Sequence, residues 1–145
     1  MAGTLLPVFE VPEFINESQQ YDTKYKRSVK WNVETGDFER DGANRMVECD
    51  GKEAFMTWCY KVVQTERYAC LAYPSSIGVE MENALAENDE KTVESMVQRT
   101  ITDALMVNPR TEYVRDFNFN READVLRCTF TVKGINWDDT FKVTV

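Results

Sequence analysis

Residues 90–133 read EKTVESMVQRTITDALMVNPRTEYVRDFNFNREADVLRCTFTVK, and this stretch decides the fold. In 90–107, apolar residues recur every three or four positions, and Pro109 follows the last of them. That spacing predicts an amphipathic helix, because residues three and four apart share a helix face and proline cannot continue the helix. In 124–133, apolar and polar residues alternate, which predicts a strand with one buried face. A helix that gives way to strands at Pro109 places the chain in the α+β class.

The C-terminal third continues as strands. A turn at 134–138 leads to a last strand with alternate apolar residues: Phe141, Val143 and Val145. We expect a three-stranded antiparallel meander whose apolar face is covered by the helices. No later segment of the sequence can pair with the last strand, so it is predicted to be an edge whose N–H and C=O groups accept another chain. The alternative is that a hairpin at 28–40 closes the sheet.

Shorter elements are predicted between the N-terminus and the long helix. In 28–40, alternate apolar residues flank a glycine-containing turn, which is typical of a β-hairpin. Residues 41–51 are predicted to be a loop and 68–73, an apolar run closed by proline, an extended segment. Residues 78–88 are predicted to be a second helix.

A third helix is predicted from about Lys52 to about Thr65. Apolar residues recur at helical spacing there, and Asp50 with Glu53 resembles a capping box. The sequence thus predicts about three helices packed on one antiparallel sheet.

Residues 1–27 are predicted to be an extended arm, and 28–145 a single α+β domain. Pro7 and Pro12 interrupt the apolar residues of the arm, and each proline disfavours a helix. The arm carries apolar and basic candidates for an anchor: Leu6, Phe9, Phe14, Lys24, Lys26 and Arg27. Either the arm folds back on its own domain, or it docks on another subunit.

Composition excludes several classes of function. The chain has 145 residues, no histidine, and 17 basic against 25 acidic residues, which gives a net charge of −8. Without histidine, Ser-His-Asp and Cys-His catalysis and histidine-ligated zinc are ruled out. An acidic chain is also a poor ligand for duplex nucleic acid or an anionic membrane, so we expect neither as a partner.

Cysteines and acids give no sign of catalysis or of a cofactor. The four cysteines contain no Cys-x-x-Cys pair, which predicts reduced thiols in a cytoplasmic protein without a metal site. Acid pairs carry little information among 25 carboxylates, and Glu66 is expected to be a structural carboxylate. We therefore predict no catalytic, cofactor-binding or metal-binding residue.

Asn108, Pro109 and Arg110 lie where the long helix meets the meander. Pro109 holds Arg110 at a rigid corner, where we expect it to be exposed. A guanidinium group there can cap the helix carbonyls or bind a partner's carboxylate. The sequence leaves both roles open.

Two motifs give the chain a family resemblance. The first is a set with fixed order and spacing: Thr65, Arg67, Tyr68, Leu71, Tyr73, Gly78, Glu80 and Glu82. The second runs from Ala104-Leu105 to Asn108-Pro109-Arg110, with Asn108 where the family has Glu. On these residues the chain resembles the sheath-initiator (baseplate wedge) proteins of contractile phage tails. It is most similar to the branch from phages, prophages and phage-tail-like bacteriocins of Gram-positive bacteria, which is related to a type VI secretion baseplate component.

The resemblance implies a structural protein that is not an enzyme. Such proteins link the baseplate wedge to the first sheath ring and template sheath assembly by strand exchange. The implied partners are the tail sheath protein and wedge proteins, with the tail tube or hub as a further neighbour. Particle symmetry implies six copies in the baseplate of a virion or tail-like particle assembled in the bacterial cytoplasm. We expect the isolated protein to be monomeric.

Two other functions stay open from the sequence. One is a generic adaptor, which would bind neither sheath nor wedge proteins. The other is a cell-wall hydrolase, which would need a groove holding two carboxyl groups about 5–9 Å apart.

Overall fold

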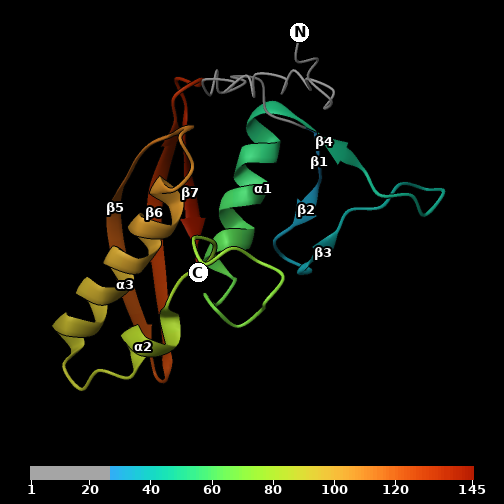
Figure 1. The fold of residues 1–145 in the computed structure, drawn as a ribbon. Helices are drawn as coiled ribbons and strands as arrows, with labels where there is room; N and C mark the ends of the chain where they lie inside the picture. Colours follow the sequence, from blue (N-terminus) through green and yellow to red (C-terminus); the bar gives the residue numbers. More distant parts are fainter. Residues whose placement is uncertain (1–26) are drawn as a thin grey trace, which may run out of the picture.

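The computed structural model describes residues 27–145, and Figure 1 shows how its elements are arranged. In chain order these are β1 (Ser28–Val29), β2 (Trp31–Asn32), β3 (Asp37–Phe38), β4 (Glu48–Cys49), α1 (Gly51–Val63), α2 (Met81–Leu85), α3 (Glu90–Met106), β5 (Thr111–Glu122), β6 (Val125–Gly134) and β7 (Thr140–Thr144). Five candidate anchor residues of the arm lie outside the described residues: Leu6, Phe9, Phe14, Lys24 and Lys26.

The predicted meander is confirmed. β5, β6 and β7 form one antiparallel sheet in that order. In Figure 1, α3 lies across the sheet and α1 runs beside β7. The largest fully buried side chains come from both helices and from β6, among them Phe55, Ile101, Leu105 and Phe130. Burial of these apolar side chains between helices and sheet makes the domain α+β, as predicted.

The long helix α3 forms almost as predicted. The Asp89 side chain accepts the Thr92 N–H at 3.0 Å and thereby caps the first turn. The predicted apolar stripe faces the core, with these members buried: Val93, Val97, Ile101, Ala104 and Leu105. The Thr111 hydroxyl donates to the Leu105 carbonyl at 2.8 Å, so the first residue of β5 satisfies a carbonyl in the last turn of the helix.

Helix α1 begins differently from the prediction. Asp50 occupies the N-cap position, but its side chain makes no capping hydrogen bond, so the predicted capping box is wrong. Gly51 follows with φ +53°, which is a left-handed backbone conformation. The backbone therefore turns between Asp50 and the helix, and the Asp50 side chain does not reach the N–H groups of the first turn. The helix ends at Val63, two residues before the predicted Thr65.

The N-terminal strands lie apart from the meander. β2 and β3 form the predicted hairpin, with Trp31 opposite Phe38. β1 pairs with β4, with Ser28 opposite Cys49, so the predicted loop at 41–51 includes a strand. A two-residue strand leaves no alternation to detect in the sequence. Because these pairs are separate from β5-β6-β7, the hairpin does not close the meander.

The segment between α1 and α3 is the least like its prediction. The second helix, α2, is only five residues long instead of spanning 78–88. Residues 68–73 are turns and bends, not an extended strand, and the Leu71 side chain is fully exposed. An apolar run implies burial only where the fold supplies a surface to cover it. Across residues 27–145, no helix has the length and apolar character needed to cross a bilayer.

Candidate functional site

The outer edge of β7 presents unpaired backbone groups. Cys128 and Val145 exchange N–H···O bonds of 2.9 Å, and the register places Phe130 opposite Val143. Hydrogen bonding alternates along an antiparallel pair, so the peptide groups of Lys142 and Thr144 point away from β6. No other strand of the described chain pairs with this side of the sheet.

The predicted edge residues hold the strand in place. Phe141 and Val143 are buried in the core, and Phe141 meets the Phe55 ring edge to face at 5.7 Å between centroids. The accessible backbone belongs to the alternate residues, Lys142 and Thr144. The sequence could not show which residues of β7 bond to β6 and which point outward, because that depends on the register between the two strands.

Helix α1 reaches this edge through Tyr60. Lys52 Nζ lies 2.8 Å from Asp139 Oδ2, and the Tyr60 hydroxyl donates to the Lys142 carbonyl at 3.3 Å. Burial raises the pKa of the Tyr60 hydroxyl, so it remains a donor at neutral pH. Tyr60 therefore covers one of the outward acceptors of β7, a contact with no signal in the sequence.

Two hollows flank the edge. A groove of about 210 Å³ lies between α1 and the hairpin, and Tyr60, Met56, Trp31 and Val33 contribute to its walls. A larger hollow of about 540 Å³ lies on the sheet face that points away from the core. Its lining is mostly neutral and polar: Asp116, Asn118, Asn120, Thr129, Thr131 and Lys142. The hollows offer apolar contact on one side of the edge and hydrogen-bonding groups on the other.

The corner after α3 is tied into the domain by its backbone. Asn108 Oδ1 accepts the Arg110 N–H at 3.0 Å, and the Asn108 carbonyl accepts the Thr111 N–H at 2.9 Å. The Arg110 carbonyl accepts the Ile135 N–H at 2.8 Å. Pro109 is exposed, whereas Arg110 is half-buried instead of fully exposed as predicted. Asn108 thus orders the corner through both its side chain and its carbonyl.

The first sequence motif forms the neck of a loop. The Arg67 N–H donates to the Val79 carbonyl at 2.8 Å, and the Val79 N–H donates to the Thr65 carbonyl at 2.9 Å. The Arg67 guanidinium lies 2.9 Å from the Gly78 carbonyl and 3.2 Å from Glu80 Oε1. Gly78 has φ +102°, and a Cβ there would lie 2.7 Å from the Thr65 carbonyl oxygen. Only glycine fits this close approach of two backbones.

The neck is also bonded to the helices. Thr100 Oγ1 of α3 accepts the Glu80 N–H at 2.8 Å, and Glu66 Oε2 accepts the Met81 N–H at 3.1 Å. Glu66 is the structural carboxylate that the sequence predicted. The two tyrosines of the motif, Tyr68 and Tyr73, lie outside this network and are exposed.

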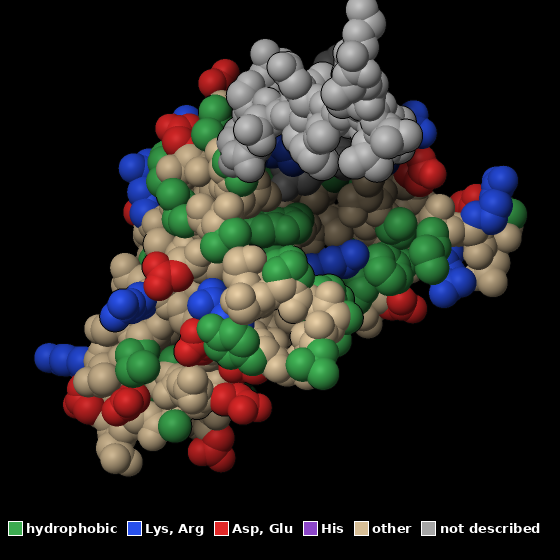
Figure 2. All heavy atoms as spheres, viewed as in Figure 1, with side chains coloured by type: hydrophobic (Ala, Val, Ile, Leu, Met, Phe, Trp, Pro, Cys, Tyr) green, Lys and Arg blue, Asp and Glu red, His purple; other side chains and the backbone are tan. Residues whose placement is uncertain are grey.

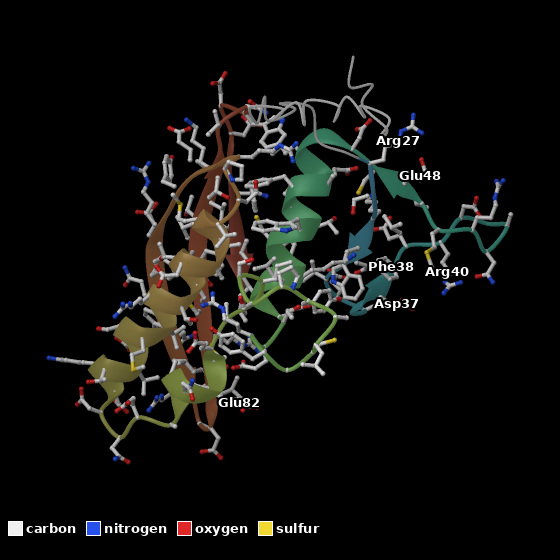
Figure 3. The ribbon with its side chains drawn as sticks, in the orientation of Figure 1. Arg27, Asp37, Phe38, Arg40, Glu48 and Glu82 are labelled. Carbon is white, nitrogen blue, oxygen red and sulfur yellow. The ribbon has the colours of Figure 1, made fainter. Side chains whose placement is uncertain are left out.

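Basic residues near β1 pair within the domain. Arg27 lies 3.3 Å from Glu48 at the surface (Figure 3). Lys30 lies 3.2 Å from Glu39, which raises the pKa of Lys30. The anchor candidate Arg27 and the nearby Lys30 are therefore both paired with acidic residues of their own domain.

The carboxyl groups with shifted pKa values do not resemble a general acid. Hydrogen bonds from the Arg45 backbone lower the pKa of Asp41, and the bond from Lys52 lowers the pKa of Asp139. A glycosidase acid requires a raised pKa instead. Within residues 27–145, no three His, Cys, Asp or Glu side chains gather as metal ligands would.

An α+β domain with an open strand edge is the kind of fold that takes up another chain by adding a strand. The chain belongs to the contractile injection system sheath initiator family, whose pattern matches residues 27–136. The family predicted from the two sequence motifs is thereby confirmed.

A relative and a solved structure agree with this assignment. Phage-like element PBSX protein XkdS of Bacillus subtilis (strain 168) is 27% identical over 131 residues, which cover 89% of this chain and 87% of that protein. A chain in the cryo-EM structure of the anti-feeding prophage baseplate, 6-fold symmetrised, matches with a TM-score of 0.56 and 20% identity. That match covers 79% of this chain and 90% of the other, and it supports the fold.

Proposed function

We propose that this protein is a non-enzymatic subunit of the baseplate of a contractile tail or tail-like particle. It links the baseplate wedge to the first sheath ring and templates the sheath by strand addition. The observation that carries this proposal is the outer edge of β7, where Lys142 and Thr144 direct peptide groups away from the sheet. Family membership supports the sheath as the source of the added strand.

Strand addition extends the meander by one strand. The incoming backbone bonds to the outward N–H and C=O groups of Lys142 and Thr144, each bond contributing about 0.5–1.5 kcal/mol net. Its side chains alternate between the α1 side, near Tyr60 and Met56, and the polar outer face. Tyr60 has to release the Lys142 carbonyl for the new bond to form.

The other surfaces are assigned to the baseplate side. In this proposal, Pro109 and Arg110 fix the junction geometry, and the 1–27 arm anchors the domain on wedge proteins with the tube or hub nearby. Six copies surround the tube in the mature particle after assembly in the bacterial cytoplasm. The 28–145 segment acts as one domain in this arrangement.

Proline at position 142 tests the edge. Because the Lys142 N–H points away from β6, Lys142→Pro removes an outward donor and blocks the edge without breaking the β6–β7 ladder. Lys142→Ala is the matched control, since it keeps the backbone donor. We expect Lys142→Pro to abolish capture of purified sheath protein from the same genome while Lys142→Ala binds like wild type. Equal binding by the two folded variants refutes templating at β7.

The baseplate side is tested with purified wedge proteins. We expect Arg110→Ala to keep the fold and weaken wedge binding, and Phe9→Ser with Phe14→Ser in the full chain to weaken it further. If Arg110→Ala instead unfolds the domain, the corner is an internal cap. A folded wild-type protein that binds neither sheath nor wedge would be an unrelated adaptor. Release of cell-wall fragments by the wild type would contradict the non-enzymatic role.

A further inference from the structure

The loop 68–77 is an apolar projection without charge. Residues 68–79 contain no Asp, Glu, Lys or Arg, in a chain that is 29% charged. The side chains of Tyr68, Leu71 and Tyr73 are 68%, 103% and 55% exposed. Figure 2 shows hydrophobic side chains at the surface over this part of the molecule. Such a cluster is characteristic of a protein-binding surface.

The neck described above fixes the two ends of this loop. Thr65 and Arg67 pair with Val79, and Arg67 also binds Gly78 and Glu80. A loop held at its base loses less conformational freedom when it binds than a free segment does. The apolar side chains are therefore displayed from an ordered base.

The loop lies at the end of the β7 edge. The Lys52–Asp139 and Tyr60–Lys142 contacts show that α1 and β7 run side by side in the same direction. Both elements therefore end at the same end of the domain, and the loop follows α1 directly. In Figure 1 the C-terminus and the segment between α1 and α2 lie toward the same end of the domain. A strand added along β7 would reach loop 68–77 as it leaves the sheet.

We propose that loop 68–77 is a second docking surface for the chain that adds to β7. Its occupant is an uncharged, apolar segment of the sheath protein that directly flanks the added strand. A charged segment is disfavoured, because the loop offers no opposite charge to compensate for lost hydration. This inference rests on the proposed function and extends its interface beyond the strand edge.

The first test replaces exposed leucines at two places. Leu71 is fully exposed, so Leu71→Ser leaves the core untouched, and Leu85→Ser on α2 is the control, with a leucine that is 51% exposed. Burial of a leucine on binding corresponds to about a tenfold to hundredfold gain in affinity. We expect Leu71→Ser to weaken binding to purified sheath protein by at least about tenfold, and Leu85→Ser to leave it unchanged.

Salt dependence gives an independent readout. An uncharged contact is not screened, so the ratio of wild-type to Leu71→Ser affinities should stay constant between low and high salt. A loss of affinity that disappears at high salt would overturn an apolar docking mode.

Cys70 provides a second measurement in the unmodified chain. It is the exposed thiol of the loop, whereas Cys49, Cys59 and Cys128 are buried. Burial also raises the pKa of Cys128 to about 11, which slows its alkylation. We expect iodoacetamide to modify Cys70 first, and saturating sheath protein to slow that reaction at least about tenfold. Unchanged alkylation of Cys70 in the complex would overturn the inference.

The Lys142→Pro variant distinguishes a failure of the docking loop from a failure of strand addition at β7. If Lys142→Pro abolishes sheath binding but Leu71→Ser binds like wild type, strand addition stands and the docking loop is refuted. If Leu71→Ser weakens binding to a wedge protein and not to sheath, the assigned occupant is wrong. If wild type fails to bind sheath, the proposed function and this inference both fall.

Discussion

Gly78→Ala is expected to open the neck of loop 68–77. A Cβ at Gly78 would lie 2.7 Å from the Thr65 carbonyl oxygen and 3.0 Å from the Arg67 nitrogen, both backbone atoms. An L-residue at φ +102° costs about 1–3 kcal/mol. Separation of the two segments of the neck, 65–67 and 78–79, also removes two backbone hydrogen bonds, worth about 1 kcal/mol each. We therefore expect a loss of about 3–5 kcal/mol.

The assay is urea unfolding together with amide hydrogen exchange. A loss of this size lowers the thermal midpoint by about 10–16 °C for a domain of this length. Gly42→Ala is the matched control, because no atom lies within 4 Å of a Cβ there and its φ is ordinary. Exchange protection should fall at the Arg67 and Val79 amides. If the two alanine variants are equally stable within about 0.5 kcal/mol, backbone approach is not the reason for glycine at 78.

Three further changes test the site and its support. Thr111→Val leaves the Leu105 carbonyl without its hydroxyl donor and should cost about 1–2 kcal/mol in urea unfolding; a neutral result means that the Asn108 N–H, 3.3 Å from the same oxygen, satisfies this carbonyl alone. Tyr60→Phe exposes the Lys142 carbonyl and should strengthen sheath binding about threefold by titration calorimetry, whereas weaker binding means that the hydroxyl contacts the added strand. The pKa of Asp139 is lowered, so its stabilising effect is present above about pH 4 and lost as the pH falls through the folded pKa. The stability difference between wild type and Asp139→Asn, measured in urea, should therefore shrink below about pH 4, and a pH-independent difference would contradict this.

Local periodicity carried most of the fold prediction. The α3 stripe and the alternation in β6 each follow from residues within one element, and both were located to within two residues. Their packing then follows, because an apolar helix stripe and an apolar sheet face must cover each other. The N-terminal hairpin was found for the same reason, since its turn chemistry is local.

Features that depend on distant partners were not predictable. β4 is a strand only because β1 lies beside it, and the 68–73 run is a turn because the Arg67 neck joins positions that are far apart in sequence. The contact of Tyr60 with Lys142 could not be predicted, because it depends on the position of β7 beside α1 in the folded domain. Within the first motif, the sequence could not separate Gly78, which shapes the neck, from Tyr73, which is exposed to solvent.

The alternation within β7 couples stability to partner binding. Phe141 and Val143 complete the core, while the residue between them presents the open backbone edge. Removal of the strand would therefore destroy the core together with the binding edge and could not distinguish the two roles. A partner strand bonded to that edge would also hold both apolar side chains in place, so binding must stabilise the folded domain by mass action. A thermal midpoint that rises with sheath concentration in wild type, but not in Lys142→Pro, is the expected consequence. A midpoint that rises equally in both would place the sheath elsewhere on the surface.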